Sequence, residues 1–166
     1  SGFVRGEGAG TLIMESREQA QKRGATILAS VVGYSNTSDA YRLTDGREDV
    51  LCVVRAMDLA IRDAKLNPAQ INYISAHGTS TSLNDRLETK AIKELFGKKA
   101  YDIPVSSLKS QTGHSTVAAG VLETIASIMM LNEQKVAPTI NYQSQDPDCD
   151  LDYVPNKARD YKMKHM

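Results

Sequence analysis

The chain has 166 residues, of which 41% are hydrophobic, and its 20 basic side chains balance its 20 acidic ones. This length suits one domain with a substantial core, so residues 1–166 are treated as a single unit. Balanced charge argues against a nucleic-acid-binding surface. The longest apolar stretch, residues 117–131, contains Glu123 and is too short to span a membrane.

The amino-terminal part of the chain contains glycine-rich turns and candidate strands. Residues 2–10 (GFVRGEGAG) lead into a predicted strand at 11–15, and a short polar helix at 16–23 ends before Gly24. The glycines match a phosphate loop only weakly, and close backbone packing beside a site explains them better. A continuous apolar run at 27–34 predicts a strand buried on both faces, followed by a polar loop at 35–47.

Helices and strands alternate through the rest of the chain. Apolar residues that recur every three or four positions predict a helix at 48–65, which ends before Pro68. The expected elements that follow are a strand at 71–76, a loop at 78–84, a helix at 85–96, a strand at 103–106, a helix at 114–132, and short strands at 136–141 and 151–154. Buried strands between amphipathic helices predict an α/β fold, with a mostly parallel sheet covered on both faces.

Two histidines follow consecutive predicted strands, where α/β folds present functional groups. His77 lies in the sequence AHGTST (76–81), and His114 ends the sequence KSQTGH (109–114). For one histidine, a polar group near a helix start is the simpler interpretation. Two imidazoles at neighbouring strand ends favour a site that stabilises an oxyanion or enolate. We also expect His114 to open a helix, whose positive end would disfavour the imidazolium form.

Polar residues around these histidines extend the candidate site. The small hydroxyl side chains of Thr79, Ser80 and Thr81 suit a narrow channel for a flexible polar ligand, although Ser80 or Thr81 could equally cap the next helix. Glu123 lies in an apolar helix and needs a partner, for which Lys109 is suitable. That pair could be structural, or it could tune the histidines electrostatically. His165 looks incidental, and the spacing of the three histidines predicts no metal site.

The two cysteines offer no nucleophile. Cys52 and Cys149 are far apart and form no recognisable disulfide or metal pattern. Without a visible secretory signal, we expect reduced thiols in an intracellular protein. Cys52 fits the interior of a helix, and the carboxylates that flank Cys149 are expected to raise the pKa of its thiol.

Five segments together resemble the carboxyl-terminal half of β-ketoacyl-acyl-carrier-protein synthases of the elongating type, closest to the type II form. The segments are 2–10 (GFVRGEGAG), 37–41 (TSDAY), 73–81 (YISAHGTST), 105–114 (VSSLKSQTGH) and 147–156 (PDCDLDYVPN). The resemblance covers essentially the whole chain. It implies the thiolase-like fold, here as one βαβαβαββ half with a mostly parallel five-stranded sheet. It also implies decarboxylative condensation of malonyl-carrier protein with an acyl chain in fatty acid elongation.

The resemblance implies roles for four charged or imidazole side chains. His77 and His114 match the family histidines that stabilise the thioester enolate, and Lys109 and Glu123 match the charged residues beside them. The family's nucleophilic cysteine belongs to the amino-terminal half, and its Gly-Phe-Gly-Gly segment would begin beyond Met166. The isolated chain is therefore expected to be inactive in condensation.

The resemblance also implies partners. Thr79 and Thr81 match positions that hydrogen-bond phosphopantetheine, which arrives on the acyl carrier protein, so neither a resident cofactor nor a metal is expected. Expected partners are the acyl carrier protein, the amino-terminal half and a second copy in a homodimer, but neither nucleic acid nor a membrane. A bacterial cytoplasm or a plastid would suit such an enzyme.

Two alternatives to a condensing enzyme remain. The missing cysteine, and Ser115-Thr116-Val117 where relatives carry apolar residues and a glycine, would fit a non-condensing subunit akin to a chain-length factor. A free-standing carrier-protein-binding module is the other alternative. The retained histidine pair favours catalysis, since a scaffold has no chemical need of it.

Overall fold

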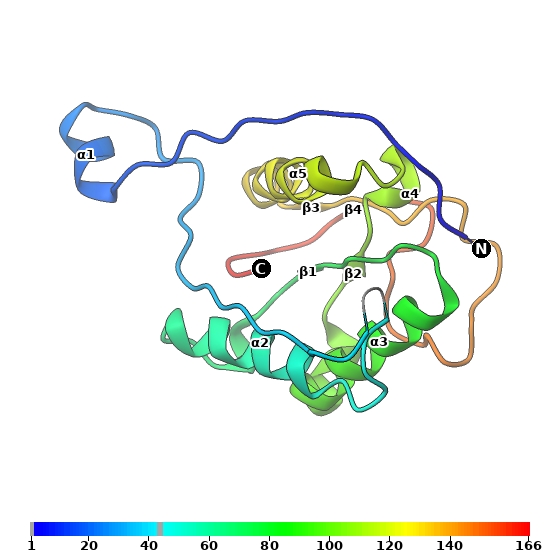
Figure 1. Cartoon of the computed structure of the whole chain (residues 1–166). Helices are drawn as coiled ribbons and strands as arrows, with labels where there is room; N and C mark the ends of the chain where they lie inside the picture. The colour runs from blue at the N-terminus through cyan, green and yellow to red at the C-terminus, as the bar shows by residue number, and fades with distance from the viewer. Residues whose placement is uncertain (1, 43–44) are drawn as a thin grey trace.

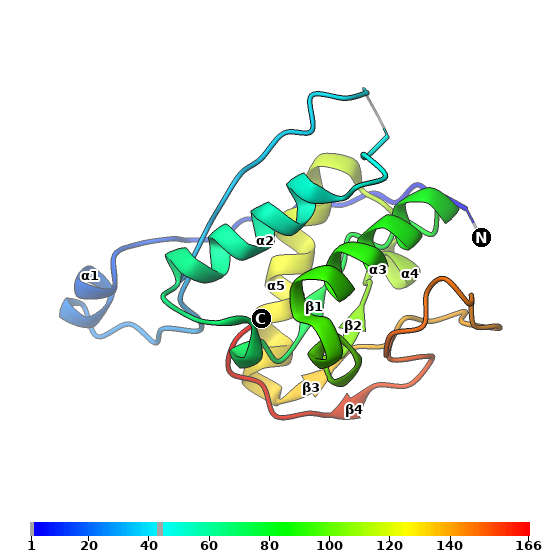
Figure 2. The same ribbon diagram turned by 90° about the horizontal axis from the view of Figure 1, so that it is seen from below.

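The computed structural model describes residues 2–42 and 45–166. Leu43 and Thr44, which belong to the predicted loop 35–47, lie outside the described residues, as does Ser1. Helices α2 (Leu51–Asp63) and α3 (Ser82–Phe96) lie side by side on one face of a small sheet, and α5 (Ala119–Glu133) covers the other (Figures 1 and 2). These three layers confirm the predicted α/β class.

The centre of the fold is a pair of parallel strands. These are β1 (Ile74–Ser75) and β2 (Val105–Ser106). Ile74 lies opposite Val105, and Ser75 lies opposite Ser106. The amide of Ala76 donates to the carbonyl of Ser106 at 3.0 Å and extends the pairing by one residue. Pro104 precedes β2 and has no N–H to donate, which limits the ladder at that end. Because parallel strands end at the same edge, the loops after β1 and β2 meet there.

The paired region is smaller than the five-stranded sheet that the sequence predicts. Residues 11–15 and 27–34 form no strand, and some of their apolar side chains are exposed, such as Ile13 by 85% and Val31 by 74%. A strand forms only where a neighbour completes its hydrogen bonds, and within residues 2–42 and 45–166 these segments have none.

The predicted carboxyl-terminal strands are also shifted. β3 (Lys135–Val136) covers only the start of the predicted strand 136–141, and its antiparallel partner β4 (Arg159–Asp160) lies beyond the predicted strand 151–154. A single parallel bridge joins Thr139 to Pro155.

The helices agree better with the sequence. α1 (Arg17–Lys22) and α2 fall within the predicted ranges, whereas α3 begins at Ser82 and shortens the predicted loop 78–84. The helix expected at 114–132 is divided into η3 (Thr116–Ala118) and α5, after a separate short helix, α4 (Lys109–Thr112). Gly113, with a φ of +68°, ends α4. His114 consequently lies in a loop and does not open a helix, contrary to the prediction.

The residues that flank β1 pack into two different apolar clusters. Ala76 packs with Ile92 on the side of α2 and α3, whereas Tyr73 packs with Met130 on the side of α5. Fully burying an aliphatic side chain such as Ile92 contributes about 1.5–3 kcal/mol. Both clusters therefore fix the strand that carries the His77 loop. Among the described residues, no helix has the length and apolarity that crossing a membrane requires.

Candidate active site

His77 stands at the first residue beyond the extended segment that contains β1. The following residue, Gly78, has a φ of +44°, and a Cβ atom there would lie 2.4 Å from the Cβ of Ser107. The Ser107 hydroxyl donates to the Gly78 carbonyl at 2.9 Å. Both the positive φ and the close approach require glycine at position 78. This glycine allows the loop at 77–80, the His77 loop, to lie directly against the end of β2.

His114 is held by the amino-terminal segment. Its amide donates to the Val4 carbonyl at 2.8 Å, and its carbonyl accepts from the Gly6 amide at 3.2 Å. A Cβ atom at Gly6 would lie 2.1 Å from the Thr112 carbonyl oxygen, so no larger residue fits there without movement. Close backbone packing beside the site, predicted for the glycine-rich segment, is confirmed.

The two imidazole rings meet edge to face. Their centroids are 5.5 Å apart, with an interplanar angle of 87°. The ring of Phe3 lies 4.8 Å from that of His114 on a tilt of 51°. Nδ1 of His114 accepts the amide N–H of Thr116 at 3.1 Å. A neutral His114 therefore carries its proton on Nε2, where it can serve as a hydrogen-bond donor.

Lys109 and Glu123 form the expected ion pair, between Nζ and Oε1. Their side chains are only 4% and 17% exposed, and neither residue borders the cavity that contains the histidines. Burial lowers the pKa of His114, electrostatic interactions with Lys109 and His77 lower it further, and Glu123 opposes them. The direction is the one predicted, but burial, not a helix end, is its main cause.

Both histidines border one cavity of about 770 Å³. Thr79 and Thr81 also line it, with their hydroxyl oxygens 2.9 Å apart. Thr81 occupies the N-cap position of α3, but its hydroxyl bonds to Thr79 and does not cap the helix. Apolar side chains from the amino-terminal segment, from α2 and its N-cap residue, and from α3 form much of the remaining wall: Phe3, Val50, Val53, Leu83 and Leu87.

The cysteines lie apart from this cavity. Neither Cys52 nor Cys149 is among its lining residues. Burial raises the pKa of the Cys149 thiol, and Asp146 adds to the effect. The pKa of Cys52 is raised mainly by its contact with Asp39. Both thiols are therefore poor nucleophiles, as predicted from the sequence.

Sequence reasoning missed two residues of the site. The sequence indicates Phe3 only as part of the glycine-rich segment, whereas in the structure it contacts His114 and lines the cavity. Glu88 was not singled out, yet its carboxylate accepts the amide N–H groups of His77 and Gly78. The available signal was a carboxylate near the start of the helix after the His77 loop, one turn beyond Asp85.

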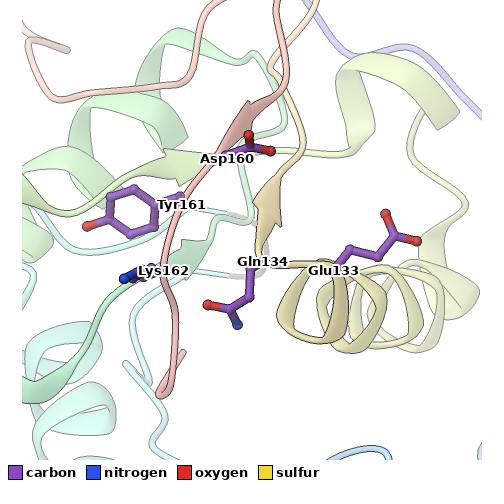
Figure 3. Close-up of a pocket in the computed structure, with 5 residues that line it drawn as sticks. All are labelled: Glu133, Gln134, Asp160, Tyr161 and Lys162. Atoms are coloured by element: carbon purple, nitrogen blue, oxygen red, sulfur yellow. The ribbon is translucent and has the colours of Figure 1, made fainter.

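A second hollow, of about 430 Å³, lies where α5 meets β3 and β4 (Figure 3). Its lining residues come from the end of α5 and from the β4 segment: Glu133, Gln134, Asp160, Tyr161 and Lys162. The side-chain amide of Gln134 donates to the Met163 carbonyl at 3.0 Å and accepts from the Met163 main-chain amide at 2.8 Å. This hollow contains neither histidine of the candidate site.

Comparisons with known proteins agree on one family. The model of the β-ketoacyl synthase C-terminal domain matches residues 28–143. The 3-oxoacyl-(acyl-carrier-protein) synthase 2 of Synechocystis sp. is 50% identical over 158 residues, which are 95% of this chain and 38% of that protein. This chain thus spans about two fifths of the length of that relative.

Solved structures give the same result. The ishigamide ketosynthase/chain length factor is 41% identical with a TM-score of 0.92, over 98% of this chain and 39% of that one. A type II PKS ketosynthase in complex with its acyl-carrier protein is 48% identical with a TM-score of 0.88, over 90% of this chain and 37% of that one. The predicted thiolase-like fold is confirmed. The chain belongs to the β-ketoacyl synthase family and contains its C-terminal domain.

Proposed function

We propose that the protein containing this chain is a 3-oxoacyl-acyl-carrier-protein synthase of fatty acid elongation, and that this chain decarboxylates the malonyl thioester. The supporting observation is the pair of imidazoles, His77 and His114, edge to face with centroids 5.5 Å apart in one cavity. The family membership supports the condensing reaction.

The reaction requires stabilisation of an enolate. The bond between the malonyl α-carbon and its carboxylate breaks, CO₂ leaves, and the electron pair moves toward the thioester oxygen. The α-carbon then attacks an acyl thioester, whose sulfur leaves as a thiolate. His114 offers a proton on Nε2 because its Nδ1 accepts the Thr116 amide. Together with His77 it supplies two donors where the negative charge develops.

The environment of the histidines supports this role. The lowered pKa of His114 favours the neutral imidazole, which donates a hydrogen bond without first losing a proton. Lys109 and Glu123 form a buried ion pair, and neither side chain lines the cavity. We assign them electrostatic tuning and support of His114, because Lys109 lowers its pKa and Glu123 raises it.

The threonines suit a substrate delivered on a flexible arm. Thr79 and Thr81 place two hydroxyl groups on the cavity wall, and we assign them to the phosphopantetheine of an acyl carrier protein. The arm is part of the substrate, so the reaction uses no resident cofactor. The nucleophilic cysteine of the condensation would be supplied by the amino-terminal half of the enzyme. The intact enzyme would form a homodimer and would function in a bacterial cytoplasm or a plastid.

The test is malonyl decarboxylation by the intact protein. We expect His77→Ala and His114→Ala each to slow CO₂ release from malonyl-carrier protein by roughly 10²- to 10³-fold, the usual cost of losing one oxyanion donor. His165→Ala is the matched control, because His165 does not border the cavity. CO₂ release at the wild-type rate from both site variants would refute the assignment.

A non-condensing, chain-length-factor-like subunit is the second candidate. The likeness to the ishigamide ketosynthase/chain length factor supports it, as does the turn after His114, where Val117 is 97% exposed. Such a subunit would release no CO₂ by itself, and the histidine variants would not change the rate of its complex with a catalytic partner.

A further inference from the structure

A buried hydroxyl group links the two segments that follow β1 and β2. Oγ of Ser107 donates to the Gly78 carbonyl at 2.9 Å and accepts the main-chain amide of Lys109 at 3.3 Å. A serine hydroxyl has one proton to donate, so its donor is committed to Gly78. Ser107 is 7% exposed and does not border the cavity, so it can act on the reaction only through the groups that it holds.

The two groups bound to this hydroxyl lead to different histidines. Gly78 directly follows His77 in the chain. Lys109 is the first residue of α4, and His114 comes two residues after that helix ends. The Ser107 hydroxyl therefore connects the loop that carries His77 to the short helix that precedes His114.

The backbone of Ser107 is itself fixed by hydroxyl groups. Its amide donates to the Thr139 hydroxyl at 3.3 Å, and its carbonyl accepts the Ser110 hydroxyl at 2.9 Å. Oγ of Ser110 in turn accepts the Ile140 amide at 3.0 Å. Ser107 thus offers the His77 loop a rigid point of attachment.

We propose that Ser107 is a positioning residue that sets the arrangement of His77 and His114 by fastening their supporting segments to each other. This inference deepens the proposed decarboxylation and rests on it. Among the described residues, the backbone ladder between β1 and β2 ends with the bond from the Ala76 amide to the Ser106 carbonyl. The imidazoles lie beyond that end on separate segments, so their 5.5 Å spacing depends on side-chain links between the segments.

The test compares Ser107→Ala with Ser106→Ala in the intact protein. Each variant removes the hydroxyl of a buried serine and keeps its Cβ, but the Ser106 hydroxyl is bonded to that of Tyr73, on the side of α5. For Ser107→Ala we expect kcat of malonyl decarboxylation to fall roughly 10- to 100-fold with KM little changed, because misplacing a reacting group costs rate more than binding. Ser106→Ala should keep kcat close to the wild-type value. Ser107→Cys, whose thiol is a weak donor and acceptor, should give an intermediate kcat.

Hydrogen exchange separates this inference from the proposed function. Peptides that cover residues 76–81 and 107–113 should both exchange faster in Ser107→Ala than in the wild type and Ser106→Ala. If the wild-type protein releases no CO₂, the proposed function fails, whereas the exchange still decides whether Ser107 joins the two segments. Unchanged exchange in either peptide, wild-type kcat in Ser107→Ala, or an equal loss of kcat in Ser106→Ala would overturn the positioning role.

Discussion

Removing Glu123 should destabilise the protein strongly, because it strands a buried ammonium group. The Lys109 side chain is 4% exposed, and its ion-pair partner is Glu123. Breaking a buried ion pair on one side costs about 3–5 kcal/mol, since the remaining charge stays in a medium of low polarity. Glu123→Leu should therefore lower the free energy of unfolding by about this amount.

The reciprocal variant should cost less. Lys109→Met leaves Glu123, whose side chain is 17% exposed and so reaches more water than Lys109 does. The double variant Lys109→Met/Glu123→Leu removes both charges and replaces them with apolar groups of similar length. Such replacements are often neutral or stabilising, so the double variant should be more stable than Glu123→Leu alone.

Urea unfolding of the intact protein, followed by circular dichroism, measures these differences. The expected order of stability places Glu123→Leu lowest, Lys109→Met above it, and the double variant close to the wild type. The decisive result is the difference in unfolding free energy between Glu123→Leu and the double variant. If Glu123→Leu unfolds at the same urea concentration as the double variant, the buried pair does not have the energetic role that its burial implies.

Three further predictions concern the cavity. Because the folded-state pKa of His114 is lowered, its imidazole should titrate below 6.5 by NMR. On acidification, the unfolded chain binds a proton at this histidine before the folded protein does. The contribution of His114 to the free energy of unfolding is therefore present above pH 6.5 and lost as the pH falls through the folded-state pKa. Gly6→Ala should lower the free energy of unfolding by about 1–3 kcal/mol in thermal unfolding and slow decarboxylation, because its new Cβ would lie 2.1 Å from the carbonyl oxygen of Thr112. Gly120→Ala is the control: no atom lies within 4 Å of its new Cβ, so it should change neither the stability nor the rate. Thr79→Val and Thr81→Val should each raise KM for the carrier-bound substrate roughly three- to tenfold, as expected for one lost hydrogen bond, and an unchanged KM would remove them from the binding site.

The sequence predicted the part of the site that follows from chain order. Successive buried strands separated by helices place their carboxyl ends at one edge, and β1 and β2 are indeed neighbours in a parallel register. The meeting of His77 and His114 follows from that rule. The partner of Glu123 was also predictable, since a carboxylate in an apolar helix needs a cation and Lys109 was the suitable one nearby.

Other features depend on tertiary contacts that periodicity does not encode. The apolar run at 27–34 has the composition of a buried strand, but pairing requires a neighbour, and within the described residues it finds none. The helix expected from residue 114 begins later, with η3 at Thr116, because Gly113, with a φ of +68°, changes the direction of the chain just before His114. The bonds from Glu88 to the His77 loop join side chain to main chain, so no pattern of apolar residues could indicate them.

The two histidines consequently depend on different parts of the chain. His77 is supported locally, by a carboxylate on the helix that follows its loop. His114 is supported from the opposite end of the sequence, through the backbone bonds to Val4 and Gly6 and the ring of Phe3. A local support can form with the loop itself, whereas a distant one requires closure of a long stretch of chain. Any change that loosens the amino-terminal segment should therefore disturb His114 first and leave the His77 loop in place.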